Sequence, residues 1–195
     1  MNKQAFWGGL LIDGTGAAPI PDSLVLVEGE HIVYAGKDNG TRDGYEAVDL
    51  TGKTVIPGLI DTHIHFGGLL SEEVRDWVLE HPLQKAMISV KEAQNTLKRG
   101  FTTVGDMSEN GIYLRNMING GNMQGPRIIA AGRGLCRSSG HSIATDVPNS
   151  FNQDNHPWAE QVDGPWEIRK AIRNRIRQAP DAFKIWTTGG GLMPL

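Results

Sequence analysis

The amino-acid sequence predicts an α/β fold in two parts, and two observations support it. Up to about Thr54, short β-prone runs are separated by Gly, Pro, Asp and Asn turn signals. Beyond Thr54, strand-like runs alternate with segments of helical periodicity. Such alternation is typical of parallel strands joined by right-handed helical crossovers. We therefore expect a small β-sandwich element at residues 1–56 and an α/β domain at residues 57–195.

Composition and spacing predict the individual elements in order. The β-prone runs of the first part lie at residues 10–12, 24–27 and 31–35. In the second part, apolar residues recur at three- and four-residue steps from Leu83 to Leu97, which predicts a helix that stops at Gly100. Two further helices are expected, near residues 112–118 and from Pro165 to Ile176. The strands of this part are expected at residues 55–66, 101–104, 127–131 and 182–187.

The strand at residues 55–66 ends in a His-x-His pair. Because side chains alternate between the two faces of a strand, His63 and His65 should point to one face and Ile64 to the other. Asp61, two residues upstream, should share the face of the histidines. Two imidazoles on one face can bind one metal ion, although His-x-His alone is a weak motif. Its position at the carboxyl end of a strand favours a metal site.

Several motifs occur in a defined order along the chain. They are Pro-Gly-Leu-Ile-Asp-Thr-His-Ile-His at 57–65, Gly-Phe-Thr-Thr-Val at 100–104 with Asp106, Gly-Pro-Arg-Ile at 125–128, Ser-Gly-His at 139–141, and Phe-Lys-Ile at 183–185 with Thr-Gly-Gly at 188–190. Together they resemble the amidohydrolase superfamily, in its imidazolonepropionase-like and Xaa-Pro dipeptidase-like branch. The resemblance implies a metal-dependent (β/α)8 barrel that hydrolyses amide or peptide C–N bonds in small molecules such as dipeptides or N-acyl amino acids.

The resemblance also implies a cofactor. Zinc is the default, with two ions expected and other divalent metals as alternatives. The enzyme would use a metal-activated hydroxide, and a cyclic amidase or deaminase of the same superfamily is the alternative enzyme class. Lys184 argues against the mononuclear deaminases, which lack a bridging lysine.

Lys184 is the second candidate ligand after the histidine pair. Its ammonium lies among apolar neighbours in a strand expected to be buried, where an unpaired charge is costly. A neutral lysine can add carbon dioxide to give a carbamate, and the resemblance implies that this group bridges two metal ions. From the residues alone, a snorkelling surface lysine is the alternative. We expect His63, His65 and Lys184 to bind metal and Lys184 to be catalytic as well.

Residues 132–164 show no periodic pattern and are expected to form a long loop of the kind that acts as a lid or binding loop. Within this segment, His141 resembles a substrate-pocket histidine of the branch, so a catalytic and substrate-binding role is expected for it. Arg137 is the second residue expected to bind substrate. His156 is expected to be a solvated loop residue.

The other polar candidates are expected to be structural. His31 and His81 are interpreted in this way, and Asp106 is expected to position a loop or the substrate rather than to bind metal. The third helix carries a basic stripe, which we interpret as its solvated outer face and not as a nucleic-acid site. The stripe consists of Arg169, Lys170, Arg173, Arg175 and Arg177.

The number of strands is half of what the resembled fold requires. A (β/α)8 barrel has eight strands and typically takes about 250 residues, whereas four such strands are predicted here. We therefore expect the N-terminal half of a barrel, from a truncated or split enzyme. The resemblance implies two more histidines and one aspartate beyond Leu195. The expected partners are a missing C-terminal half or a second copy of the chain, besides a small amide or peptide substrate; the alternative is a non-catalytic fragment that binds its complement.

Composition excludes several other classes of function. The net charge of −3 gives no attraction to nucleic acid. No apolar run approaches the about 20 residues that span a membrane, and the first residues lack a signal-peptide core. The single Cys136 excludes an intrachain disulfide and fits a reducing compartment. We expect a cytoplasmic protein without nucleic-acid or membrane partners.

Overall fold

The computed structural model describes residues 2–141, 144, 147–156 and 158–188. The chain divides into two compact units, Met1–Pro57 and Gly58–Leu195. None of the helices in the described part of the chain combines the length and the apolar character that crossing a membrane requires.

The first unit is a single mixed sheet in its described residues. Its strands are β1 (Lys3–Leu11), β2 (Ile20–Glu28), β3 (His31–Lys37), β4 (Glu46–Asp49) and β5 (Thr54–Val55). The order is β3-β2-β1-β4, with β5 also pairing with β1. Ala5, Leu24 and Leu26 are buried on one face. This sheet is one layer, and the expectation that it is the N-terminal part of a composite β-sandwich stays a prediction.

The predicted strand at residues 55–66 is two separate strands. β5 ends at Val55 and pairs with β1 in the first unit, whereas β6 (Leu59–Ile64) belongs to the second unit. Pro57 between them has no backbone N–H to donate, so it cannot continue a strand ladder. The His-x-His pair therefore lies at the end of β6, which begins after this break.

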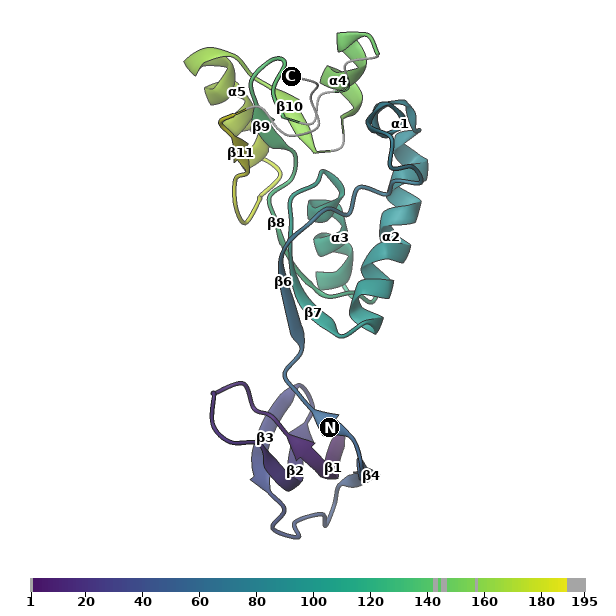
Figure 1. Ribbon diagram of the computed structural model, residues 1–195, viewed down its shortest axis with the longest axis vertical. Helices are drawn as coiled ribbons and strands as arrows, with labels where there is room; N and C mark the ends of the chain where they lie inside the picture. The colour runs from purple at the N-terminus through teal and green to yellow at the C-terminus, as the bar shows by residue number, and fades with distance from the viewer. Residues whose placement is uncertain (1, 142–143, 145–146, 157, 189–195) are drawn as a thin grey trace. The chain divides into compact units, whose positions relative to one another are not determined.

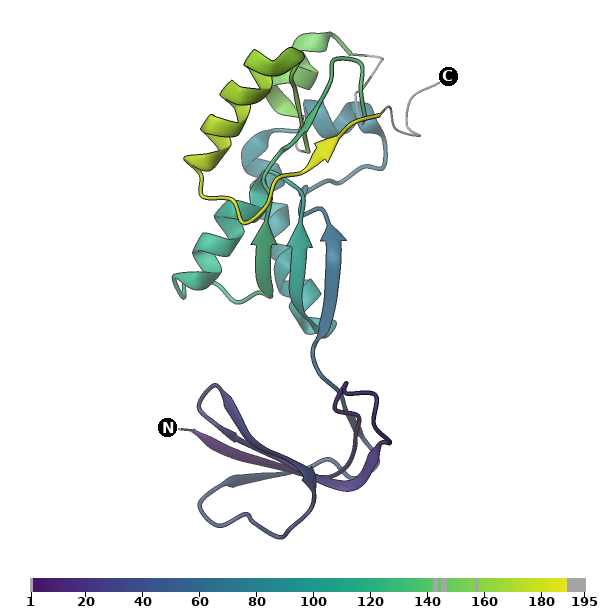
Figure 2. The same cartoon turned by 90° about the vertical axis from the view of Figure 1, so that its left-hand side faces the viewer.

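The second unit alternates strands with helices, and this confirms the predicted α/β class. Its elements after β6 are α1 (Val74–Leu79), α2 (Pro82–Lys98), β7 (Phe101–Asp106), α3 (Asn110–Asn119), β8 (Arg127–Ala130), β9 (Gly134–Cys136), α4 (Asn149–Asn155), β10 (Ala159–Gln161), α5 (Gly164–Ile176) and β11 (Ile185–Trp186). The described residues form two three-stranded sheets, β6-β7-β8 and β10-β9-β11, in which every pair is parallel. Figure 2 shows β6, β7 and β8 side by side with their arrowheads at the same end.

Local sequence explains where α2 begins and ends. His81 caps the helix, because its Nδ1 accepts a hydrogen bond from the backbone N–H of Leu83 at 3.2 Å. Pro82 occupies the first turn, where its missing N–H costs nothing. Gly100 follows the last turn with a φ of 93°, which only glycine adopts without strain. The predicted helix and the structural reading of His81 are both confirmed.

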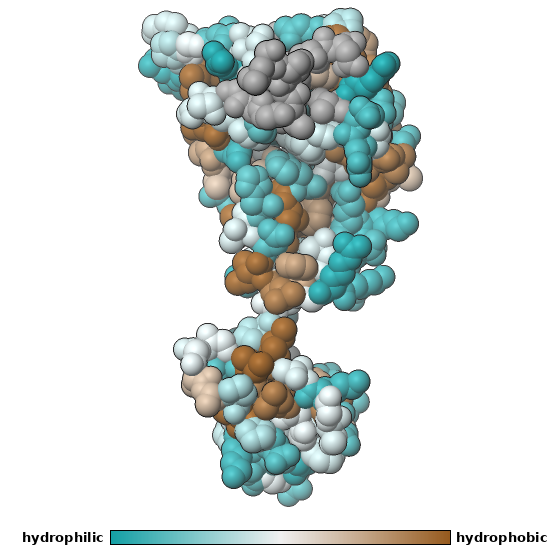
Figure 3. Space-filling model, in the orientation of Figure 1, coloured by the Kyte–Doolittle hydropathy of each residue, from teal (hydrophilic) through white to brown (hydrophobic). Residues whose placement is uncertain are grey.

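Helices α2 and α3 cover one face of the β6-β7-β8 sheet (Figure 1). The strands send Val104, Ile128 and Ala130 into a core that they share with the helices and with Phe66. Residues of the opposite face alternate with these and are exposed, with Ile60 at 66% and Ile129 at 42%. Hydrophobic side chains are visible at the surface of this unit in Figure 3.

The segment at residues 132–164 is not the structureless loop that was predicted. It contains β9, α4 and β10, and α5 packs Ala171 and Ile172 against Leu135 and Val162. The predicted strand at 182–187 is reduced to Ile185–Trp186 and pairs with β9. Strands of two or three residues are too short to show a period of two, which explains why the pattern missed them.

Arg175 corrects the reading of the basic stripe on α5. It was predicted to be solvated, but its side chain is buried and its guanidinium pairs with Glu160 Oε2 at 3.0 Å and donates to Gln178 Oε1 at 2.8 Å. β10 supplies Glu160, and the sequence pattern gave no sign of this strand. Arg175 thus connects α5 to the second sheet.

Candidate functional site

A β-bulge at the end of β6 sets the direction of the histidine side chains. Asp61 pairs with Val104 and Ile64 pairs with Asp106, so three steps on β6 match two steps on β7. Since Val104 and Asp106 share a face, Asp61 and Ile64 share it too, and His63 is turned to the other face. The prediction that Asp61 shares the face of the histidines is therefore wrong. Its carboxylate instead accepts a hydrogen bond from the backbone N–H of His63 at 3.0 Å.

His63 and His65 lie next to each other beyond this bulge. Their ring centroids are 5.3 Å apart, and the ring of His65 contacts the indole of Trp158 at 4.5 Å. The Nδ1 atom of His65 is buried and has no hydrogen-bond partner among the described residues. Burial above all, together with the nearby His63 and Lys184, lowers the pKa of His65 to about 4. His65 is therefore a neutral imidazole at physiological pH, which is the form that binds metal.

Lys184 and His141 join the histidine pair from distant parts of the chain. Lys184 lies directly before β11, and its Nζ is 3.4 Å from Nε2 of His63. The same Nζ lies 5.1 Å from the ring centre of Trp186. His141 stacks on Trp186 with ring centroids 5.1 Å apart and planes at 14°. Burial and then Lys184 lower the pKa of His141.

These residues fit one part of a metal centre. Two imidazoles at the end of β6 and a lysine amine converge, and the buried Nδ1 of His65 has no hydrogen-bond partner among the described residues. The described residues contain no group of three or more His, Cys, Asp or Glu that could hold a metal ion. His63, His65 and a carboxylated Lys184 would therefore supply some of the ligands, and other groups would be needed to complete the coordination.

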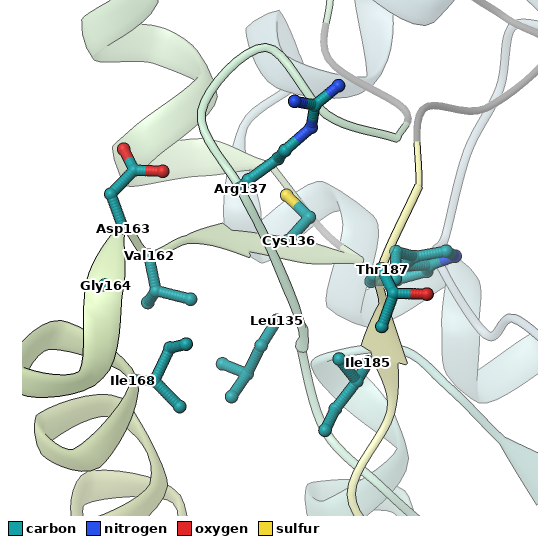
Figure 4. Close-up of a pocket in the computed structure, with 10 residues that line it drawn as sticks. Leu135, Cys136, Arg137, Val162, Asp163, Gly164, Ile168, Ile185 and Thr187 are labelled. Carbon is teal, nitrogen blue, oxygen red and sulfur yellow. The ribbon is translucent and has the colours of Figure 1, made fainter.

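Arg137 lies in another part of this region. It lines a cavity of about 300 Å³ between β9, β11 and the start of α5, together with apolar side chains that include Leu135, Ile168 and Ile185. Figure 4 shows its guanidinium directed away from these apolar side chains. The structure gives no described contact between Arg137 and His63, His65, His141 or Lys184, and its substrate role stays a prediction.

A buried polar network fixes the backbone directly after His65. The carboxylate of Asp106 accepts hydrogen bonds from the N–H of Phe66 at 2.7 Å and from the hydroxyl of Ser108 at 2.9 Å. The carbonyl of Phe66 accepts from Ser89 Oγ at 2.9 Å and from Asn110 Nδ2 at 3.1 Å. Burial raises the pKa of Asp106 to about 6, against the effect of these donors. Asp106 holds the loop after β6, as its position at the end of a strand suggested, whereas Ser89 and Asn110 were not identified from the sequence.

His156 was predicted to be solvated, and this prediction is wrong. It is completely buried after α4, where its Nδ1 accepts from the backbone N–H groups of Trp158 at 3.2 Å and Ala159 at 3.1 Å. The sequence gave no sign of it because the burying elements, α4 and β10, were themselves not predicted. Trp158 was given no role from the sequence for the same reason, although a large aromatic residue in a loop on the active side is a recognisable signal.

The chain is similar to known proteins over most of its length. The model of the amidohydrolase family matches residues 54–193, which is well over half of the chain. Ochratoxinase from Aspergillus niger is 26% identical over 201 residues, an alignment that covers 94% of this chain and 42% of the relative.

Solved structures give the same picture. A prolidase in complex with N-methylphosphonate-L-proline is 28% identical with a TM-score of 0.86, over 99% of this chain and 48% of that one. A Xaa-Pro dipeptidase with methionine bound in its active site is 30% identical with a TM-score of 0.78, over 97% and 48%. The chain thus spans about half the length of the relatives that it matches.

Proposed function

Because the chain belongs to the amidohydrolase family, we propose that it forms part of a metal-dependent hydrolase of amide or peptide C–N bonds in small molecules. The relatives named prolidase, Xaa-Pro dipeptidase and ochratoxinase support a dipeptide or an N-acyl amino acid as the substrate class. One observation carries the proposal most directly: the amine of Lys184 lies 3.4 Å from His63, although the two are 121 residues apart in the sequence.

His63, His65 and Lys184 are the residues proposed to hold the metal, with zinc as the default ion and two ions per site. The amine of Lys184, when neutral, adds carbon dioxide; a C–N bond forms, one proton is released, and the resulting carbamate offers two oxygen ligands. A divalent metal ion, when bound, polarises the scissile carbonyl and makes water more acidic. The protein residues orient the site: Trp186 fixes the ring of His141, which is proposed to contact the substrate.

The family and the parallel strands support the proposal that the second unit is the first half of a (β/α)8 barrel. In the described residues β6 pairs only with β7, and the exposed Ile60 and Ile129 lie on the face that a closed barrel would bury. The proposed partner is the C-terminal half of the barrel, with a second copy of the chain as the alternative. The free and buried thiol of Cys136 supports a cytoplasmic location.

The experiment that tests the metal site compares zinc binding by the wild-type chain and by the His63→Ala/His65→Ala variant. Wild type should bind zinc weakly, because few protein ligands are present, and the variant should lose most of that binding. His31→Ala is the matched control, since His31 lies on the exposed β3 of the first unit. Equal zinc content in wild type and the double variant would refute the assignment of these histidines as ligands.

A further inference from the structure

Trp158 contacts His65 although it belongs to a distant segment of the chain. It lies between α4 and β10, and its ring centroid is 4.5 Å from that of His65, with the ring planes inclined by 35°. A flat aromatic surface at this distance restricts the directions in which an imidazole can turn. The contact therefore concerns the orientation of a proposed metal ligand.

The main chain of Trp158 is held on both sides. Its carbonyl accepts a hydrogen bond from the N–H of Gly134, at the start of β9, at 2.7 Å. Its N–H donates to Nδ1 of the completely buried His156 at 3.2 Å. The backbone of Trp158 is thus fixed to the β10-β9-β11 sheet and to the residue that follows α4.

The indole itself is held by Trp77 of α1. The two ring centroids are 4.2 Å apart, and Trp77 is almost fully buried. Trp77 is in turn anchored at two atoms: its Nε1 donates to the carbonyl of Ser71 at 2.9 Å, and its carbonyl accepts from Nζ of Lys85 at 3.0 Å. A side chain supported in this way presents a rigid surface to His65.

Gly67, two residues after His65, provides the space for this arrangement. A Cβ atom at this position would lie 2.8 Å from Nε1 of Trp158, closer than side-chain carbons approach other heavy atoms. A larger residue would therefore push the indole away without itself contacting the imidazole ring. The position of the Trp158 indole therefore requires a glycine at residue 67.

We propose that Trp158 is a positioning residue for His65: its indole, supported by Trp77 and admitted by Gly67, fixes the imidazole in the orientation that binds metal. The proposal rests on the proposed function, in which His65 is a metal ligand. It assigns Trp158 no contact with the reacting atoms. An imidazole that is already oriented loses less freedom when it binds metal, so its affinity is higher.

The test measures zinc affinity of the 195-residue chain by competition with a chelator, alongside circular dichroism to confirm folding. Trp158→Leu should weaken zinc binding by about 3- to 10-fold, the scale of one aromatic contact. Gly67→Ala should do the same through displacement of the indole, and Trp158→Phe should retain affinity close to that of wild type. Trp166→Leu is the control, because Trp166 is 75% exposed on α5.

A second measurement needs no metal. In the chain combined with its proposed second half, the ring nitrogens of His65 should give one sharp set of NMR signals in wild type and in Trp158→Phe, and broadened or doubled signals in Trp158→Leu. If the wild-type chain binds no zinc, the proposed function fails, and these signals alone decide the positioning role. The inference is overturned if Trp158→Leu leaves both measurements unchanged, or if Trp158→Phe loses as much affinity as Trp158→Leu.

Discussion

At the scale of single residues, the site is a cluster of basic groups. His63, His65, His141 and Lys184 lie within contact range of one another or of shared tryptophans, and the described residues place no third His, Cys, Asp or Glu ligand beside the histidine pair. Each group that accepts a proton raises the cost of protonating the next, which adds to the effect of burial on the pKa of His65 and of His141. The cluster thus favours the neutral imidazoles of His65 and His141, and a neutral imidazole is the form that binds a metal ion.

Lys184 should carry a carbamate when the metal site is complete. We expect a carbon-13 signal from labelled bicarbonate on the wild-type side chain, in a chain combined with its proposed second half and loaded with zinc. Lys184→Arg should lose that signal and one of the two metal ions, because a guanidinium cannot form the bridge. Lys98→Arg, at the last turn of α2, is the control. An unmodified Lys184 in a fully metal-loaded protein would contradict the dinuclear assignment.

Asp106 should make the stability of the second unit depend on pH. Its pKa is about 6 in the folded chain and near 3.8 when unfolded. The folded state holds the proton more tightly, so the contribution of this group to stability is complete below about pH 4 and is lost as pH rises through 6. The difference in unfolding free energy between Asp106→Asn and wild type should shift in favour of the variant by about 2 kcal/mol from pH 4 to pH 8. Urea denaturation at a series of pH values measures it, and a pH-independent difference would show that Asp106 is not the group responsible.

At the scale of elements, the loop after β6 depends on close approaches of neighbouring backbones. Gly111 lies in the first turn of α3 against the buried carboxylate of Asp106, and an added Cβ would collide with Oδ2 of that residue. The carboxylate cannot move aside easily, because the N–H of Phe66 and the hydroxyl of Ser108 hold it. The hydrogen bonds of Asp106 thus restrict position 111, in the first turn of α3, to glycine.

Gly111→Ala should therefore destabilise the chain, although helix propensity alone predicts a gain of about 1 kcal/mol. We expect a loss of about 1–3 kcal/mol, the usual cost of overpacking. Asn116→Ala, at an exposed position of the same helix, should change stability by less than about 0.5 kcal/mol. Thermal unfolding of the three proteins compares them, and a stabilised Gly111→Ala would show that Asp106 is free to move.

Elements with a long periodic pattern could be predicted from the sequence, and short ones could not. α2 is marked by a full repeat of apolar residues and by Gly100, and the His-x-His pair is marked by its strand. β9 and β10 have three residues each, so their pairing depends on partners far along the chain and leaves no local trace, whereas β11 was predicted as a longer strand than the one formed. Because β10 had no local sequence signal, the burial of His156 and Arg175 could not be predicted either. The bulge that turns Asp61 away from the histidines is a register effect between two strands, which one strand's alternation cannot reveal.

At the scale of the whole molecule, the chain matches about half of its relatives' length, and this sets the expectation for activity. Residues 1–195 alone should not hydrolyse dipeptides or N-acyl amino acids, because His63, His65 and Lys184 leave the metal coordination incomplete. The exposed apolar face of the β6-β7-β8 sheet should also make the isolated chain self-associate. Addition of a second half from a related full-length enzyme should restore turnover and a monodisperse species. Turnover by the purified, monodisperse chain alone that depends on metal and disappears in His63→Ala would refute the half-barrel proposal.

The buried cysteine has a practical consequence for all of these experiments. Cys136 is packed with Ala159 and Trp186, and burial raises the pKa of its thiol to about 11. The thiolate is the form of cysteine that reacts with alkylating reagents, and a thiol with so high a pKa forms little thiolate at neutral pH. The native sequence is therefore a ready background for site-specific labels: a cysteine introduced at an exposed position such as Tyr113 should react with a maleimide dye while Cys136 stays unmodified. Fluorescent reporters of assembly with a second half can be attached without first removing the native thiol.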